Sequence, residues 1–111
     1  MPRLTSDFWV SAYLRQAAHD GLDAVLRRRG ASEAGAIFVK LDRLDGTGAL
    51  YGPAPQALAD EDGARRFQLI LDADPLAIED RMERERRFDP DLWLVEIENR
   101  QGDPRLDLVG D

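Results

Sequence analysis

The sequence predicts a single compact domain of the α/β class, at the border with α+β, in which two helices pack on a mixed sheet of four or five strands. Two observations predict this fold. An Asp-Pro-Asp turn at residues 89–91 runs directly into a strand pattern that carries Trp93. An alternating segment at 35–43 precedes Asp45-Gly46, which is a strong hairpin signal. The expected order is a helix, an ambiguous segment, three strands, a second helix and a last strand.

Length and charge bound the number of domains and the kinds of partner. The chain has 111 residues, close to the commonest size of one domain, and we expect residues 1–100 to form it. Residues 101–111 are expected to be a frayed acidic tail. The net charge of −7 disfavours nucleic acid and anionic membranes as partners, because both attract basic surfaces.

Composition also bears on location and on reactive groups. The N-terminus has no apolar stretch of the signal-peptide kind, and no apolar run has the length of a membrane span, so we expect a cytoplasmic protein. The chain has no cysteine, which excludes disulfides, thiolate nucleophiles and cysteine-ligated metal sites.

The first helix is expected over residues 7–20, because apolar side chains recur there at helical spacing. Ser6 or Asp7 can cap its start, and Gly21 can end it. A strand through Phe8–Leu14 is the alternative that the aromatic content leaves open. The apolar face consists of Trp9, Val10, Tyr13, Leu14 and Ala17.

The next segment, residues 22–29, fits either a second helical turn or a first strand. We favour the strand, because a hairpin partner follows directly after the break at 30–35. The strand at 35–43 has the period-two pattern of a sheet with one face toward water, since Ile37, Val39 and Leu41 alternate with Phe38, Lys40 and Asp42.

The hairpin returns through residues 48–52 and stops at Pro53 and Pro55, because proline cannot donate to a sheet ladder. An acidic loop at 58–63 follows. The strand after it is expected over 65–72, with Phe67, Leu69 and Leu71 on one face.

The second helix is expected over residues 75–87. Asp74 is suited to cap it and Pro75 fits its first position, where the missing N–H has no intrahelical role. Its apolar stripe is narrow and consists of Leu76, Ile78 and Met82, followed by Phe88. Two pairs have the spacing of helical ion pairs, Asp80 with Arg84 and Glu83 with Arg87.

The last strand is expected over residues 91–98. Trp93, Val95 and Ile97 should face the core, while Leu94, Glu96 and Glu98 face the other way, with the two glutamates within reach of Lys40 and Arg43. The strand–helix–strand order across 65–98 predicts parallel pairing between its two strands.

The loop from Tyr51 to Gln56 is the best candidate for a segment that contacts a ligand. Pro53 and Pro55 stiffen it, which lowers the entropic cost of binding, and Tyr51 and Gln56 supply a ring and an amide. Arg66 adds a cation nearby in sequence. The alternative, which we favour, is a rigid connection whose Tyr51 packs on the sheet.

Motifs for catalysis are scarce. His19, the one histidine, has no nucleophile near it in sequence, no serine lies in a Gly-x-Ser-x-Gly elbow, and no phosphate-binding glycine loop is present. Acids at 60–62, and a second group of Asp89, Asp91, Glu96 and Glu98, are ligands of the kind that hard cations take. Solvated loop acids and a capped turn explain them more simply, so we expect no cofactor and no metal.

Four blocks together resemble a known family. They are Ser6-Asp-Phe-Trp-Val-Ser-Ala12, Ala34-Gly-Ala-Ile-Phe-Val-Lys40, Leu50-Tyr-Gly-Pro-Ala-Pro-Gln56 and Arg87-Phe-Asp-Pro-Asp-Leu-Trp-Leu-Val-Glu-Ile-Glu98. In this order they resemble a family of small alphaproteobacterial proteins labelled domain of unknown function 1491, over about residues 4–100. The resemblance implies a compact α/β domain of the bacterial cytoplasm, with no known activity, cofactor or catalytic residue.

Three functions follow as hypotheses. The first is a non-catalytic binding or interaction module for a protein or small molecule, with a homodimer as one form of it. The alternative is a small carboxylate-based enzyme, with or without a divalent metal, whose acids Asp89, Asp91, Glu96 or Glu98 converge in a concave site. A third is binding of small anions by Arg65, Arg66 and the arginines at 84–87.

Overall fold

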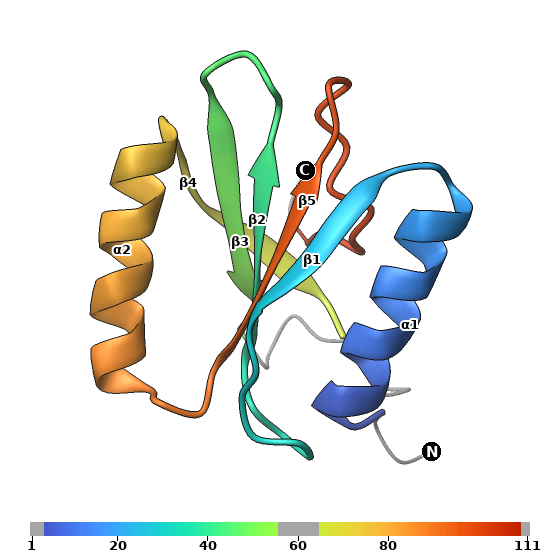
Figure 1. Ribbon diagram of the computed structural model, residues 1–111. Helices are drawn as coiled ribbons and strands as arrows, with labels where there is room; N and C mark the ends of the chain where they lie inside the picture. Colours follow the sequence, from blue (N-terminus) through green and yellow to red (C-terminus); the bar gives the residue numbers. More distant parts are fainter. Residues whose placement is uncertain (1–3, 56–64, 110–111) are drawn as a thin grey trace.

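The computed structural model describes residues 4–55 and 65–109, which contain two helices and one five-stranded sheet (Figure 1). The predicted fold class, the single domain and the order of elements are confirmed, and the arrangement is best described as α+β. The elements are α1 (Ser6–His19), β1 (Asp23–Arg28), β2 (Ile37–Asp42), β3 (Gly48–Pro53), β4 (Phe67–Ala73), α2 (Pro75–Phe88) and β5 (Trp93–Glu98). The acidic loop predicted at 58–63 lies outside the described residues.

The strands lie in the order β1-β5-β2-β3-β4, with β2 and β5 parallel and every other neighbouring pair antiparallel. The predicted β2–β3 hairpin is confirmed. Two predicted pairings are wrong: β1 pairs with β5 rather than with β2, and β4 does not neighbour β5. The apolar strands β2 and β5 take the middle of the sheet, where both faces are covered, and the more polar β1 and β4 form its edges.

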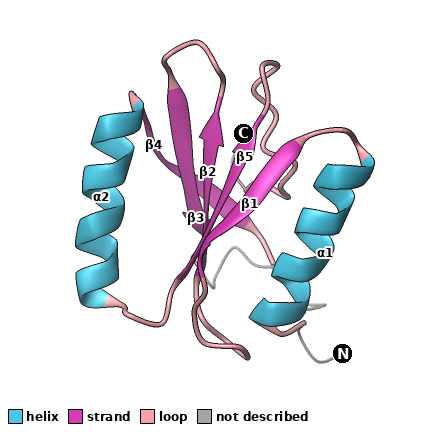
Figure 2. Ribbon diagram, in the orientation of Figure 1, coloured by secondary structure: helices cyan, strands magenta, loops and turns pink. Residues whose placement is uncertain are grey.

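The two helices cover opposite faces of the sheet (Figure 2). On the α1 face, Trp93, Val95 and Ile97 have no exposed surface and pack with Val10 and Tyr13 of the helix, as predicted for β5. The α2 face has its own apolar cluster, which consists of Phe38, Leu50, Ile78, Met82, Leu92 and Leu94. The prediction of a water-facing side of β2 is therefore wrong, because α2 covers it.

Strand β4 departs from simple alternation. Its pairing with β3 shifts register between Leu50 and Tyr51, so one residue of β4 has no direct partner. Phe67 packs in the α1-side cluster, whereas Leu71 packs against the α2-side cluster and Leu69 is exposed. The prediction that these three side chains share one face is wrong, because the bulge turns the strand between them.

A side chain just before each helix caps its first turn. Asp74 caps α2 by accepting from the Ala77 N–H, and Pro75 is its first residue, as predicted. At α1 the capping side chain is Thr5, not Ser6 or Asp7, and it accepts from the N–H of Phe8.

The apolar stripe of α2 is narrower than predicted. Ile78 and Met82 are buried, but Leu76 is 72 % exposed and Phe88 is 90 % exposed. The helix forms the ion pairs Arg81–Glu85 and Glu83–Arg86, rather than the predicted Asp80–Arg84 and Glu83–Arg87. Three- and four-residue spacings both bring helical side chains together, so spacing alone does not choose between them.

The segment after β5 contacts the α1 side of the molecule. The Tyr13 hydroxyl donates to the Pro104 carbonyl at 2.6 Å, Leu106 packs on the core, and Leu108 bridges Phe67 at the edge of β4. Fraying of residues 101–111 stays a prediction. No helix among the described residues is long and apolar enough to cross a membrane.

Candidate functional site

A pocket of about 380 Å³ lies where four elements meet at one end of the sheet. The start of α1, the start of β2, the end of β3 and the start of β4 all contribute to it. Its lining combines apolar side chains with two arginines and one glutamate. The lining residues that matter to its chemistry are Ala36, Ile37, Pro53, Phe67, Glu33, Arg65 and Arg66.

Hydrogen bonds fix one of these arginines at the start of α1. The fully buried Ser6 hydroxyl donates to the Gly35 carbonyl at 2.6 Å and accepts from Arg65 Nη2 at 3.1 Å. Arg65 Nη2 also donates to the Leu4 carbonyl at 3.0 Å. Arg66 Nε lies 3.6 Å from Asp107 Oδ2, which links the pocket to the C-terminal segment.

The N-terminus of α1 beside the pocket is already satisfied. The backbone N–H groups of Ser6 and Asp7 donate to the carbonyls of Glu33 and Ser32, at 3.0 and 2.9 Å. The next N–H is bonded to the Thr5 side chain. Because these donors are used within the protein, the charge of the pocket depends on its side chains rather than on free helix N–H groups.

Two of the predicted site residues, Pro53 and Arg66, line this pocket. Tyr51 does not, because its ring is buried in the α1-side cluster, and burial raises the pKa of its hydroxyl. Pro55 directly follows the lining residue Ala54 in the chain, and it is exposed. Gln56 lies outside the described residues. A binding role for this set stays a prediction. Leu4, Ala36 and Ile37, which sequence reasoning did not select, reach the pocket only through the fold.

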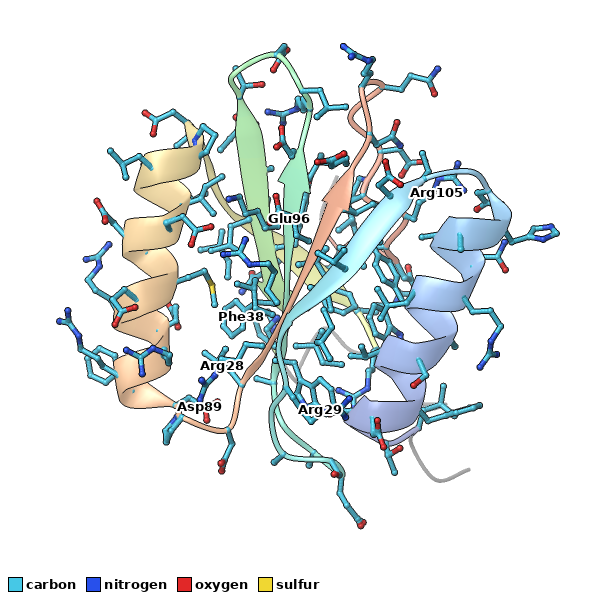
Figure 3. All side chains as sticks on the ribbon, viewed as in Figure 1. Arg28, Arg29, Phe38, Asp89, Glu96 and Arg105 are labelled. Carbon is cyan, nitrogen blue, oxygen red and sulfur yellow. The ribbon has the colours of Figure 1, made fainter. Side chains whose placement is uncertain are left out.

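The carboxylates proposed for an enzyme do not converge. Asp89 Oδ1 accepts from the Asp91 N–H at 3.0 Å, which is the turn cap expected from the sequence. Glu96 instead forms an ion pair with Arg27, and it lies well away from Asp89 in Figure 3. Among residues 4–55 and 65–109, no group of three or more His, Cys, Asp or Glu side chains can hold a metal ion.

A partly exposed ionic network, in which Lys40 alone is buried, joins the sheet to α2. The Lys40 ammonium, buried on β2, donates to Glu79 Oε2 at 2.7 Å, and Arg27 lies 3.4 Å from Glu79 Oε1 and also pairs with Glu96. The hydrogen bond from Lys40 is the main cause that lowers the pKa of Glu79. The expected pairing of Lys40 with Glu96 is wrong, because α2 brings Glu79 over the strand. Arg43 pairs with Asp72, at 2.8 Å, rather than with the glutamates of β5.

The protein is similar to other small bacterial proteins along nearly its whole length. The solution structure of protein Atu0922 from A. tumefaciens has 43 % identity and a TM-score of 0.84, with 99 % of this chain and 98 % of that chain covered. A crystal structure of a DUF1491 family protein from Caulobacter crescentus has 32 % identity and a TM-score of 0.80, with 98 % and 100 % covered. An NMR structure of a DUF1491 family protein from the same organism has 33 % identity and a TM-score of 0.79, with 99 % and 100 % covered.

The family assignment rests on the sequence as well as on these structures. No curated protein matches the chain. The family described as "Protein of unknown function (DUF1491)" matches residues 4–107, which is nearly the whole chain. The blocks around Trp9, Tyr51 and Trp93 that suggested this family fall within that match. The chain therefore belongs to the DUF1491 family.

Proposed function

We propose that this protein is a non-catalytic binding module, and that its ligand enters the pocket at the start of α1. The observation that carries the proposal is the pocket itself. Its volume of about 380 Å³ falls in the range of small-molecule sites, and it joins apolar surface to guanidinium groups held by the fold. The carboxylate-based enzyme has no comparable support, because its acids serve a turn and an ion pair.

The lining indicates the class of ligand. Arg65 and Arg66 outnumber Glu33, the one acid of the lining, on a protein whose net charge is −7, while Asp107 pairs with Arg66 from outside the lining. Ile37, Pro53 and other apolar residues supply a surface for hydrocarbon. The ligand that fits this combination is a small organic acid with an apolar body, bound in the cytoplasm where we place the protein.

A thermal-shift screen tests this proposal, because a ligand that binds only the folded state raises the melting temperature. The screen compares small apolar carboxylic acids with the amides of the same acids. We expect acids to raise the melting temperature and the matching amides to leave it unchanged.

The variant for this screen is Arg66→Gln, with Arg100→Gln as its control, because Arg100 is exposed and remote from the pocket. We expect Arg66→Gln to bind the acids about tenfold more weakly, in keeping with loss of a charge-assisted hydrogen bond. An equal response from Arg66→Gln and Arg100→Gln would contradict the proposal, as would a screen in which no acid binds.

A second candidate, self-association, has support from the edge strand β1. Among the described residues, β1 has a neighbouring strand on one side only, and Val25 is 54 % exposed there. Antiparallel pairing of two copies about Val25 would bring the exposed Val25 side chains of the two copies together. Sedimentation at micromolar concentration tests this candidate, and a monomer that persists at every concentration would remove it.

A further inference from the structure

A second hollow, of about 260 Å³, lies on the opposite face of the sheet, between β1 and α2. Three arginines, two glutamates and three apolar residues line it. It shares no lining residue with the pocket at the start of α1. Its chemistry is therefore independent of the function proposed above.

An irregularity in β1 builds this hollow. Leu26 pairs with Val95 and Arg28 with Leu94, so Arg27 is an extra residue in the ladder. A regular strand would send Arg27 and Arg28 to opposite faces, because side chains alternate. The bulge places both on the α2 side, where both line the hollow.

The arginines of the hollow differ in their partners. Arg27 forms ion pairs with Glu79 and Glu96, and Arg86 forms one with Glu83. Arg28 forms no ion pair among the described residues, although the Glu83 carboxylate is near enough to interact with it electrostatically.

Arg28 has one hydrogen-bond acceptor among the described residues. Its Nη2 donates to the Pro90 carbonyl at 2.6 Å, and its buried Nε has no acceptor in the described part of the chain. A buried guanidinium N–H without an acceptor is an exception that calls for one, since buried polar groups are normally paired.

We propose that this hollow binds a small organic carboxylate. Its oxygens accept hydrogen bonds from the Arg28 guanidinium, whose planar array of donors matches a carboxylate. Its apolar part contacts Met82, Leu92 and Leu94, which also line the hollow. The volume of about 260 Å³ limits the ligand to the size of a single aromatic acid. Figure 3 shows Arg28 beside the foot of α2, where the loop through Asp89 leads back to the sheet.

NMR of the unmodified protein gives the first test, with benzoate as the probe and benzamide as its uncharged match at equal ionic strength. We expect benzoate at millimolar concentration to shift the Nε–H resonance of Arg28 and the methyl resonance of Met82. Benzamide should leave the Arg28 resonance unchanged. Equal shifts with both compounds, or an Arg28 resonance that benzoate does not move, would overturn the proposal.

The variant Arg28→Lys gives the second test, because lysine keeps the positive charge but removes the planar guanidinium. We expect benzoate to bind it about tenfold more weakly, as judged from the Met82 methyl shift. Arg84→Lys is the matched control, since Arg84 is exposed on α2 and does not line the hollow, and it should bind as the wild type does. Binding to Arg28→Lys at the wild-type affinity would refute the role of the guanidinium.

The Arg66→Gln variant separates the two sites. It alters the pocket at the start of α1 and leaves the hollow intact, so it should retain the shifts at Arg28 and Met82. Loss of those shifts in Arg66→Gln would show that benzoate acts from the first pocket, and it would overturn this inference without touching the proposed function.

Discussion

The ion pair between Lys40 and Glu79 gives the sharpest prediction about stability. The Lys40 residue is 6 % exposed, and its ammonium lies 2.7 Å from Glu79 Oε2. Glu79→Leu leaves that ammonium buried without its carboxylate. Breaking a buried pair from one side costs about 3–5 kcal/mol, and we expect the lower end because the Glu79 side chain is 39 % exposed.

The matched variants separate charge from packing. Lys40→Met removes the buried charge and keeps a side chain of similar size, so it should change the free energy of unfolding by less than about 1 kcal/mol. The free energy of unfolding of the double variant should lie within about 1 kcal/mol of that of Lys40→Met, because the double variant has no ammonium at position 40 that Glu79→Leu could leave unpaired. The coupling between the two sites is then roughly 2 kcal/mol or more.

Urea denaturation of the wild type, the two single variants and the double variant measures these free energies. The comparison requires that the slope of the unfolding free energy against urea concentration is the same in all four proteins. Glu79→Leu should melt about 12 °C below the wild type, at about 4 °C for each kcal/mol in a chain of this size. The reasoning fails if the double variant is as unstable as Glu79→Leu, since the loss would then come from packing of α2.

Acid should weaken the ion pair between Lys40 and Glu79. The hydrogen bond from Lys40 lowers the pKa of Glu79 from its ordinary value of 4.5. A carboxyl group with a lowered pKa in the folded state contributes stability above its unfolded pKa, and loses it as the pH falls through the folded value. The wild type should therefore lose more stability below about pH 4.5 than Lys40→Met does.

Three further substitutions test the packing. Gly30→Ala should cost more than about 3 kcal/mol in urea denaturation, because its Cβ would lie 2.2 Å from the Asp91 carbonyl oxygen. Tyr13→Phe should cost about 1–2 kcal/mol by removing the bond to Pro104. Burial raises the pKa of Tyr13, so the wild type should also lose stability as the pH rises above about 10, and pH-dependent melting should show that Tyr13→Phe lacks this loss. Trp93→Phe should cost about 2–3 kcal/mol, because it leaves a void and removes the indole hydrogen bond to the Ala31 carbonyl, and hydrogen exchange near the 30–35 loop should quicken.

Features that depend on a few neighbouring residues could be predicted from the sequence. Asp74 with Pro75 fixes the start of α2, and the Asp45-Gly46 turn closes the β2–β3 hairpin. The inward face of β5 followed from the alternation around Trp93. Each of these signals acts over one turn or one strand, so no knowledge of the rest of the chain was needed.

Pairing between distant strands could not be predicted in the same way. β5 inserts between β1 and β2, which depends on competition among strands for the buried middle of the sheet. The apolar run Trp93-Leu-Val95 was a usable signal, because central strands of this kind are apolar on both faces. Lys40 misled the prediction for β2, since a single lysine suggested water on a face that α2 and Glu79 in fact cover.

The candidate site was predicted only in part. The stiffness of the loop at Pro53 and the charge of Arg66 selected two residues that line the pocket. Leu4, Ala36 and Phe67 line it because three separate elements end or begin there, and their sequence neighbourhood carries no sign of that meeting. Tyr51 was an attractive candidate by its chemistry, yet the alternation of β3 turns its ring into the core.

Mapping of backbone amide shifts on the unmodified protein, during titration with the small acids that raise its melting temperature, tests the binding proposal most directly. We predict that at least one acid perturbs the amides of Ala36, Ile37, Ala54 and Phe67 together, because these residues line one pocket from three strands. The contrary result is a set of acids whose shifts all fall elsewhere on the molecule, or that cause none. In that case the pocket at the start of α1 is a feature of packing and not a binding site.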